Sequence, residues 1–129
     1  MLHIVIATLQ CTVIDCPSPI ALGRFYREIL GWKLDGSDPS WVTLTSPGGQ
    51  RLAFQAAPDH RPPRWPDPEH PQQFHLDFDV PTRDDIDAAH ERVIALGATF
   101  LHDSGGQTSG FRVFSDPAGH PFCLCYGQM

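Results

Sequence analysis

An excess of positive charge is missing from this chain, which has 9 Lys and Arg against 15 Asp and Glu and a formal net charge of −6. Nucleic acids and anionic membranes bind basic surfaces, so neither is an expected partner. No apolar run approaches the roughly 20 residues of a membrane-spanning helix. Residues 1–10 are apolar but contain no Lys, Arg or small-residue cleavage site, which is untypical of a signal peptide. We therefore expect a cytoplasmic protein.

Cysteines are few, and a phosphate-binding glycine loop is missing. Two of the four cysteines lie near each end of the chain, at positions 11, 16, 123 and 125. A chain of 129 residues can bury a core without disulfides, so free thiols are expected in the cytoplasm. The glycine-rich segment 104–110 lacks the Lys and the helix that follow a phosphate loop. This segment is instead predicted to be a mobile loop.

The first half of the chain predicts a strand, a helix and three further strands. Alternation predicts a strand over residues 9–15. Ser18 is a suitable N-cap, Pro19 suits the first helical position, and Gly31 suits a left-handed C-cap. Apolar residues recur between them at helical spacing: Leu22, Phe25, Tyr26, Ile29 and Leu30. The three further strands are predicted over residues 32–34, 41–45 and 51–56.

A proline-rich segment separates this half from a second copy of the same pattern. Residues 58–72 contain six prolines, which exclude regular structure and predict a linker, with Trp65 as its anchor. A strand is then predicted over residues 74–80, and Thr82 with Asp85 resembles a capping box at the start of a helix. The apolar face of that helix is Ile86, Ala89, Val93 and Leu96, and His90 is expected at its surface. Gly97 ends the helix, and the last strands are predicted over residues 98–102, 111–115 and 121–126.

The two halves align along their whole length. Cys11 aligns with His75 at an offset of 64 residues, Leu30 with Leu96 at 66, and the Pro-Gly-Gly turn at 47–49 with Pro-Ala-Gly at 117–119. Neither half can bury its sheet face alone, so the copies are expected to pair. The predicted fold class is α+β, with two tandem βαβββ modules that form a cupped mixed sheet in a single domain, residues 1–129. Module 1 covers about residues 8–57, the linker 58–72 and module 2 about 73–127.

Three motifs in this order resemble the vicinal oxygen chelate superfamily of glyoxalases, bleomycin resistance proteins and extradiol dioxygenases. They are Cys16-Pro17-Ser18-Pro19 with Phe25-Tyr26 and Leu30-Gly31-Trp32, then His75-Leu76-Asp77-Phe78-Asp79-Val80, then Asp116-Pro117-Ala118-Gly119. The resemblance covers residues 9–126 and is greatest to the compact glyoxalase-like members. It implies a small-molecule ligand in the cavity of the cupped sheet, and it also implies a homodimer.

The resemblance further implies four metal-ligand positions on the first and last strands of the modules. They fall on Cys11, His75, Cys123 and Ala53, or on Gln55 in place of Ala53 after a two-residue slip. Only His75 is a usual ligand and both usual carboxylates are missing, which disfavours glyoxalase-type and dioxygenase chemistry. No cofactor is therefore favoured. The alternative is a zinc ion held by Cys11, His75 and Cys123, with its fourth position open to water.

Several side chains are candidates for the ligand cavity: Cys11, Trp41, Ala53, Gln55, His75, Arg112 and Cys123. Trp41 would form an aromatic wall or pack in the core, and Arg112 would meet an anionic group or point to solvent. His75 and Asp77 share one face of a strand and form the candidate acid–base pair.

Two functions follow, and whether the protein is an enzyme stays open. The favoured hypothesis is a glyoxalase-like protein that binds a small aromatic or antibiotic-like molecule and has a degraded metal site. The alternative is a metal-dependent lyase, isomerase or dioxygenase that acts on vicinal oxygens with an atypical Cys/His/Cys ligand set.

Overall fold

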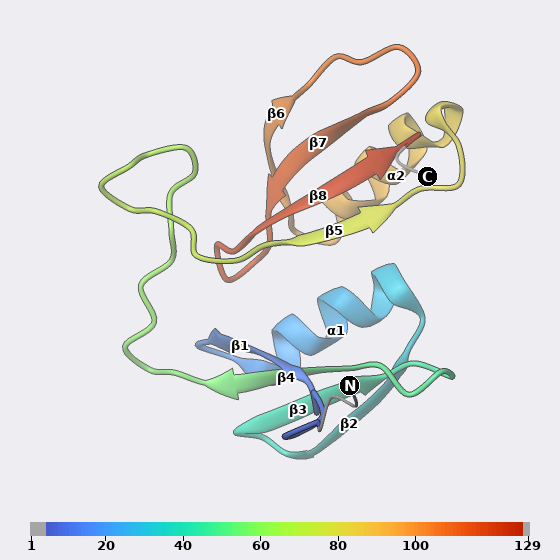
Figure 1. The fold of residues 1–129 in the computed structure, drawn as a ribbon. Coiled ribbons are helices and arrows are strands. Elements are labelled where there is room, and N and C mark those ends of the chain that lie inside the picture. Colours follow the sequence, from blue (N-terminus) through green and yellow to red (C-terminus); the bar gives the residue numbers. More distant parts are fainter. Residues whose placement is uncertain (1–4, 128–129) are drawn as a thin grey trace. The chain divides into compact units, whose positions relative to one another are not determined.

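The computed structural model describes residues 5–127, and the chain forms two compact units divided in the sequence between Pro58 and Asp59 (Figure 1). The first unit contains β1 (Thr12–Cys16), α1 (Pro19–Leu30), β2 (Lys33–Asp38), β3 (Trp41–Thr45) and β4 (Arg51–Ala56). The second contains β5 (Leu76–Asp79), the short 3₁₀ helix η1 (Arg83–Asp85), α2 (Ile86–Ala95), β6 (Thr99–Asp103), β7 (Gly110–Ser115) and β8 (Pro121–Tyr126).

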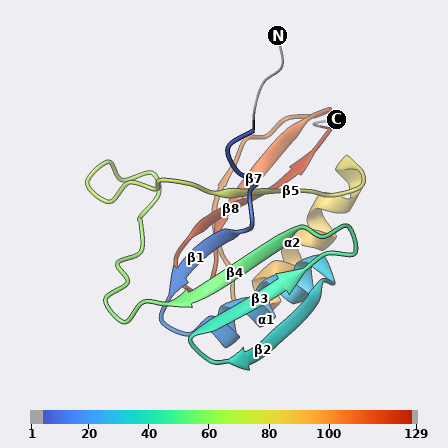
Figure 2. The same ribbon diagram turned by 60° about the horizontal axis from the view of Figure 1, so that its bottom comes forward.

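Each unit is a four-stranded mixed sheet with one α-helix on one of its faces (Figures 1 and 2). The strand orders are β1-β4-β3-β2 and β5-β8-β7-β6, and in both units the first strand lies parallel to the last. The other neighbouring strands are antiparallel. The same topology in both units confirms the predicted α+β fold of tandem βαβββ modules.

Helix α1 has the predicted caps and buries Leu22, Phe25 and Tyr26 of the predicted apolar face. The Ser18 hydroxyl accepts a hydrogen bond from the Ala21 N–H at 3.4 Å, and Gly31 has a φ of 70°, the left-handed conformation that glycine adopts most easily. The Tyr26 ring stacks on Phe54 of β4 at a centroid distance of 5.8 Å. A Cβ at Gly23 would lie only 2.9 Å from Val42 of β3, so glycine allows the helix to approach the sheet closely.

Helix α2 packs less deeply against its own sheet. The Asp85 carboxylate accepts hydrogen bonds from the Thr82 N–H at 2.9 Å and from the Thr82 hydroxyl at 2.8 Å, so these two residues pair as predicted. Ile86 and Val93 of the predicted apolar face are buried. Leu96, the last residue of the predicted apolar face, remains 38% exposed. It is the C-cap residue and lies beyond the last helical turn.

The proline-rich linker has no helix or strand between β4 and β5, within the described residues, as predicted. It is attached to the second unit at two places. His60 Nε2 lies 3.0 Å from the Ala118 carbonyl oxygen, and Trp65 packs against Val113, Cys123 and Cys125. The predicted role of Trp65 as an anchor is therefore confirmed.

Strand ends differ from prediction by a few residues. Strand β1 begins at Thr12 rather than at residue 9, and β5 covers Leu76–Asp79 rather than residues 74–80. Both are edge strands whose pairing with one neighbour sets their length, and that pairing is not encoded locally. Cys11 and His75 consequently lie just before their strands. Neither α1 nor α2, the α-helices of the described region, has the length and apolar character needed to cross a bilayer.

Candidate functional site

The two faces of the second sheet have different surroundings. On one face, His90 of α2 contacts Phe114 at a centroid distance of 5.0 Å, and Phe114 stacks on Phe122 at 5.4 Å. Side chains alternate along a strand. Phe122 faces α2, so Cys123 and Cys125 on the same strand face away from α2. This second surface, the face of the β5-β8-β7-β6 sheet opposite α2, is called the open face below.

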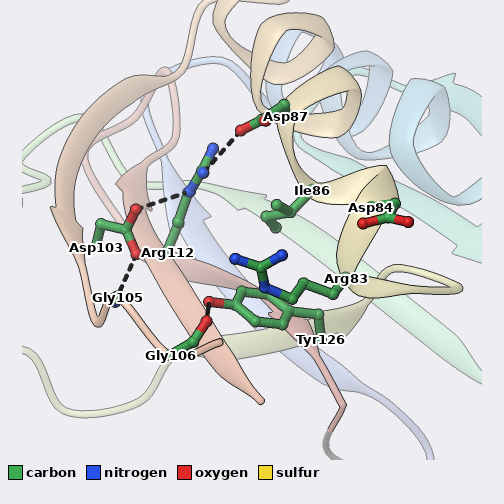
Figure 3. A pocket seen from close by; sticks show the side chains of 9 residues that line it. All are labelled: Arg83, Asp84, Ile86, Asp87, Asp103, Gly105, Gly106, Arg112 and Tyr126. Atoms are coloured by element: carbon green, nitrogen blue, oxygen red, sulfur yellow. Dashed lines mark hydrogen bonds and ion pairs between the residues drawn. The ribbon is translucent and has the colours of Figure 1, made fainter. Parts of the chain in front are cut away.

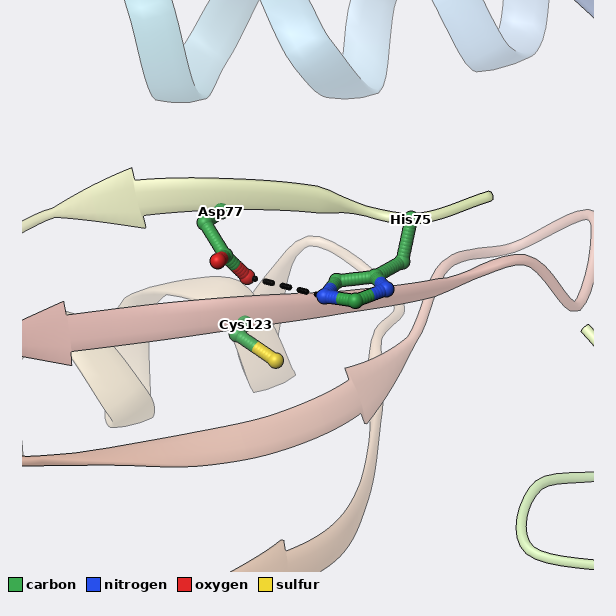
Figure 4. A group of neighbouring side chains, drawn as sticks. All are labelled: His75, Asp77 and Cys123. Carbon is green, nitrogen blue, oxygen red and sulfur yellow. Dashed lines mark ion pairs between the residues drawn. The ribbon is translucent and has the colours of Figure 1, made fainter. Parts of the chain in front are cut away.

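His75, Asp77 and Cys123 gather on the open face (Figure 4). Asp77 pairs with Cys123 in the parallel β5–β8 register, and His75 comes two residues earlier on the same side as Asp77. His75 Nε2 lies 3.2 Å from Asp77 Oδ1, and the ligand-type atoms of the three residues all lie within 4.8 Å of one another. The imidazole and the carboxylate are exposed, whereas Cys123 is buried. The structure thus brings together the predicted His75–Asp77 pair and one predicted cysteine.

The Cys123 thiol of this cluster and the thiol of Cys125, two residues along β8, are held in their protonated form. Burial raises the pKa of Cys123 to about 12, with further contributions from the negative charge of Asp77 and from a hydrogen bond with it. Burial likewise raises the pKa of Cys125 to about 11, helped by the charges of Asp77 and Asp79. At neutral pH, Cys123 is therefore a hydrogen-bond donor beside a carboxylate and a poor nucleophile.

In the first unit, the corresponding face carries few groups that can bind a metal. Val13 pairs with Ala53 as Asp77 pairs with Cys123, and Asp15 pairs with Gln55 as Asp79 pairs with Cys125. The register therefore makes Ala53, rather than Gln55, the counterpart of Cys123. Ala53 is buried and its methyl group offers no ligand atom. Cys11 is a half-buried free thiol just before β1, and Trp41 is half-buried at the start of β3.

Arg112 lies on the other side of its sheet from the site. Its guanidinium pairs with Asp87 of α2 at 2.8 Å and Asp103 of β6 at 3.2 Å, and it donates to His90 Nδ1 at 3.1 Å. Arg112 therefore cannot share an open-face ligand with His75, and its expected place in that cavity is wrong. The sequence alone did not decide on which face of the sheet Arg112 lies, because it gave no sign of the acidic partners. His90 also faces the sheet rather than solvent, because it contacts Phe100 and Phe114.

Arg112, Asp87 and Asp103 border a pocket of about 190 Å³ on the α2 side of the second sheet (Figure 3). Its wall includes Arg83 of η1, Asp103 and Tyr126, and the Tyr126 hydroxyl donates to the Gly106 carbonyl oxygen at 2.6 Å. The sequence did not predict this pocket, because its residues come from η1, α2, β6, β7, β8 and the loop between β6 and β7. Among its lining residues, Arg112 is already paired with Asp87 and Asp103.

Comparison with known proteins agrees with this architecture. A family model described as a glyoxalase-like domain matches residues 11–125, which is most of the chain. The chain belongs to the glyoxalase-like domain family. This places it in the vicinal oxygen chelate superfamily, as the three motifs indicated. No protein of curated function matches the sequence significantly.

Several solved structures share the fold of this glyoxalase-like protein at low sequence identity. A glyoxalase/bleomycin resistance protein/dioxygenase family enzyme from Burkholderia phytofirmans PsJN is 22% identical, with a TM-score of 0.74 over 93% of this chain and 98% of that one. A glyoxalase/dioxygenase from Nostoc punctiforme is 21% identical, with a TM-score of 0.69 over 98% of both chains. Oxidase ChaP-H2 is 20% identical, with a TM-score of 0.65 over 95% and 94%.

Members of this superfamily often bind metals, and the described part of the glyoxalase-like chain contains one group of side chains that could hold a metal ion. Zinc takes nitrogen, sulfur and oxygen ligands at about 2.0–2.3 Å, and the donors of His75, Asp77 and Cys123 are close enough to converge by side-chain rotation. These three residues therefore fit a zinc-type ligand set. Compared with the predicted ligands, this set contains Asp77 in place of Cys11. Alternation along the strand already placed Asp77 on the same face as His75 in the sequence. The Cys123 proton must leave when a metal binds.

Proposed function

We propose that this glyoxalase-like protein binds a small organic molecule on the open face of its second module. The observation that carries the proposal is the exposed His75–Asp77 pair beside the protonated Cys123 thiol. Together they offer hydrogen-bond donors and acceptors next to the apolar cluster of Val113, Cys123 and Cys125. A few oriented polar groups beside an apolar surface are typical of small-molecule sites.

The proposal favours binding over family-type metal catalysis. By resemblance, four side chains hold the metal in the metal-dependent members, and in this chain one of those positions is the methyl group of Ala53. The thiol at another position carries a proton that a metal must displace. A ligand held by hydrogen bonds needs neither a fourth donor nor a thiolate.

A thermal-shift screen of small aromatic and antibiotic-like compounds tests this function. Binding compounds should raise the Tm of the wild type and lose that effect in His75→Ala. His70→Ala is a matched control, because His70 forms a similar exposed pair, 3.1 Å from Asp67, in the linker. Stabilisation that is unchanged in His75→Ala would contradict the proposed site.

A second candidate function rests on the His75, Asp77 and Cys123 cluster. In this alternative the three side chains hold a divalent metal such as zinc, which acts as a Lewis acid on vicinal oxygens in a lyase, isomerase or dioxygenase reaction. Elemental analysis of untagged protein, dialysed in turn against zinc, nickel, manganese and iron, distinguishes the candidates. Near-stoichiometric metal that is lost in both His75→Ala and Cys123→Ala would favour the metal-dependent enzyme.

The resemblance also supports a homodimeric assembly, which we include in the proposal. Light scattering after size exclusion should then give about twice the chain mass of 14.3 kDa. A mass of one chain at micromolar concentration would contradict this assembly.

A further inference from the structure

We infer that Trp65 makes the open-face site selective for planar aromatic alcohols. The inference rests on the proposed function and specifies the ligand class of the same site. Trp65 belongs to the linker, yet its indole packs on Val113, Cys123 and Cys125, which form the apolar part of the open face. An aromatic residue from outside the sheet therefore borders the site.

Cys123 is the residue that connects Trp65 with the polar pair. It belongs to the cluster on which Trp65 packs, and its sulfur lies within 4.8 Å of the His75 and Asp77 ligand atoms. A ligand that covers this cluster would therefore lie near both the indole ring and the two hydrogen-bonding groups. Trp65 itself is only half-buried, so part of its ring remains available for contact. Stacked or edge-to-face aromatic pairs are more favourable than their buried area alone predicts.

The polar pair offers an acceptor to a ligand. Asp77 Oδ1 faces His75 Nε2 at 3.2 Å, and the carboxylate has a second oxygen that can also accept. A hydroxyl group can donate a hydrogen bond to that oxygen, whereas an ether cannot. The site therefore favours an aromatic ring that bears a hydroxyl group.

The indole is held in place without a ligand. Trp65 contacts His102 of β6 at a centroid distance of 5.6 Å, and the linker is attached upstream through His60 and Ala118. Pro62 also lies against Gly119, where a Cβ would come within 2.5 Å of the proline Cβ. A wall that is already ordered loses little conformational entropy on binding, which favours affinity.

Three probes separate the parts of this inference in calorimetric titrations. The first is 2-naphthol, which has both the planar ring and the hydroxyl group. The second is 2-methoxynaphthalene, which lacks the donor, and the third is decahydro-2-naphthol, which lacks the aromatic ring. We expect the wild type to bind 2-naphthol about tenfold more tightly than either analogue, from one aromatic contact or one hydrogen bond.

Substitutions then assign the aromatic preference to Trp65. Trp65→Leu should weaken 2-naphthol binding about tenfold and change decahydro-2-naphthol binding less than threefold, and Trp65→Phe should largely retain the preference. Trp32→Leu, a half-buried tryptophan of the first module, is the matched control and should change neither affinity. Circular dichroism verifies that each variant is folded. If Trp65→Leu does not fold, the probe preference of the wild type and of Trp65→Phe still decides.

The outcomes distinguish this inference from the proposed function. Equal weakening of both alcohols in Trp65→Leu, or no preference for 2-naphthol in the wild type, would overturn the role of Trp65. If another compound of the screen still stabilises the protein in a His75-dependent way, the proposed function stands without it. If no compound shows His75-dependent binding, both are wrong.

Discussion

The two modules share a backbone plan but differ in what their sheets present away from the helices. Both have the same strand order and the same register between first and last strand. On the helix side, both bury stacked aromatic rings, Tyr26 with Phe54 in one and Phe114 with Phe122 in the other. On the opposite side, the partner of Val13 is Ala53, whereas the partner of Asp77 is Cys123. Among the described residues, the group of side chains that could hold a metal therefore lies on the second module.

The two faces of each sheet meet different requirements, one for folding and the other for a ligand site. The helix-facing side must fill a close-packed core, so its side chains remain large and apolar in both copies. The opposite side is under no such packing requirement at positions 75 and 77, which are exposed. These positions can carry polar groups at little cost in stability. A site on one module is thus compatible with a symmetric scaffold.

The largest expected effect tests the shared part of the comparison. Phe54→Ala and Phe122→Ala each remove a ring that is 0% exposed, and each should lower the free energy of unfolding by about 3–5 kcal/mol. Urea denaturation measures both. A loss below about 1 kcal/mol in only one variant would mean that the two cores are not equivalent.

Thiol reactivity sharpens the difference between the modules. A pKa raised from 9.0 to about 12 lowers the thiolate fraction of Cys123 about a thousandfold. A more basic thiolate is also more nucleophilic, which offsets about half of this decrease on a logarithmic scale and leaves a rate about thirtyfold lower. In metal-free protein at pH 8, Cys123 should therefore react with Ellman's reagent at least about thirtyfold more slowly than the less buried Cys11. Variants that retain a single cysteine measure each rate. Equal rates for Cys11 and Cys123 would contradict the predicted environment.

The raised pKa of Cys123 predicts how the stability of the protein changes with pH. Folding raises the pKa of Cys123, so the native state holds this proton more tightly than the unfolded state. Its contribution to stability is complete below about pH 9 and is lost as the pH rises toward about 12. Cys123→Ala should reduce the loss of stability over this range in urea denaturation. An unchanged pH dependence would place the thiol in a more solvated environment.

A smaller effect tests how α2 is held. Arg112→Leu removes the group that joins Asp87, Asp103 and His90, and it should cost about 1–2 kcal/mol, since Asp87 is largely exposed and its pair is screened. Arg51→Leu on β4 of the first module, a half-buried arginine, is the control and should cost less. Chemical denaturation compares the two variants. An equal cost would show that the network adds nothing specific.

The smallest effect concerns the helix caps. Ser18→Ala removes a 3.4 Å capping contact and Asp85→Ala removes two contacts below 3.0 Å, so the costs should be about 0.5 and 1 kcal/mol respectively. Thermal unfolding monitored by circular dichroism is sufficient to rank them. The reverse ranking would mean that the start of α2 is less ordered than that of α1.

Local sequence signals predicted the fold well because they are encoded in neighbouring residues. Strands 41–45, 51–56 and 121–126, the Pro19 start of α1 and the Gly31 cap all match the structure. The candidate site was predicted only in part. The grouping of His75 with Asp77 follows from alternation, but the side on which Arg112 lies depends on acidic partners in α2 and β6. Such partners are distant in the chain and leave no periodic signal.

Features set by neighbouring residues could be predicted from the sequence, whereas features set by contacts between distant segments could not. Periodicity, caps and the internal repeat were sufficient to predict two βαβββ modules, because backbone geometry acts over a few residues. The choice between Ala53 and Gln55 required the β1–β4 register, which is set by pairing across 40 residues of chain. The packing of Trp65 on the cluster that contains Cys123 and the high pKa of that thiol likewise arise from burial by distant segments. Only the tertiary structure decided these features, because contacts and desolvation depend on which segments come together.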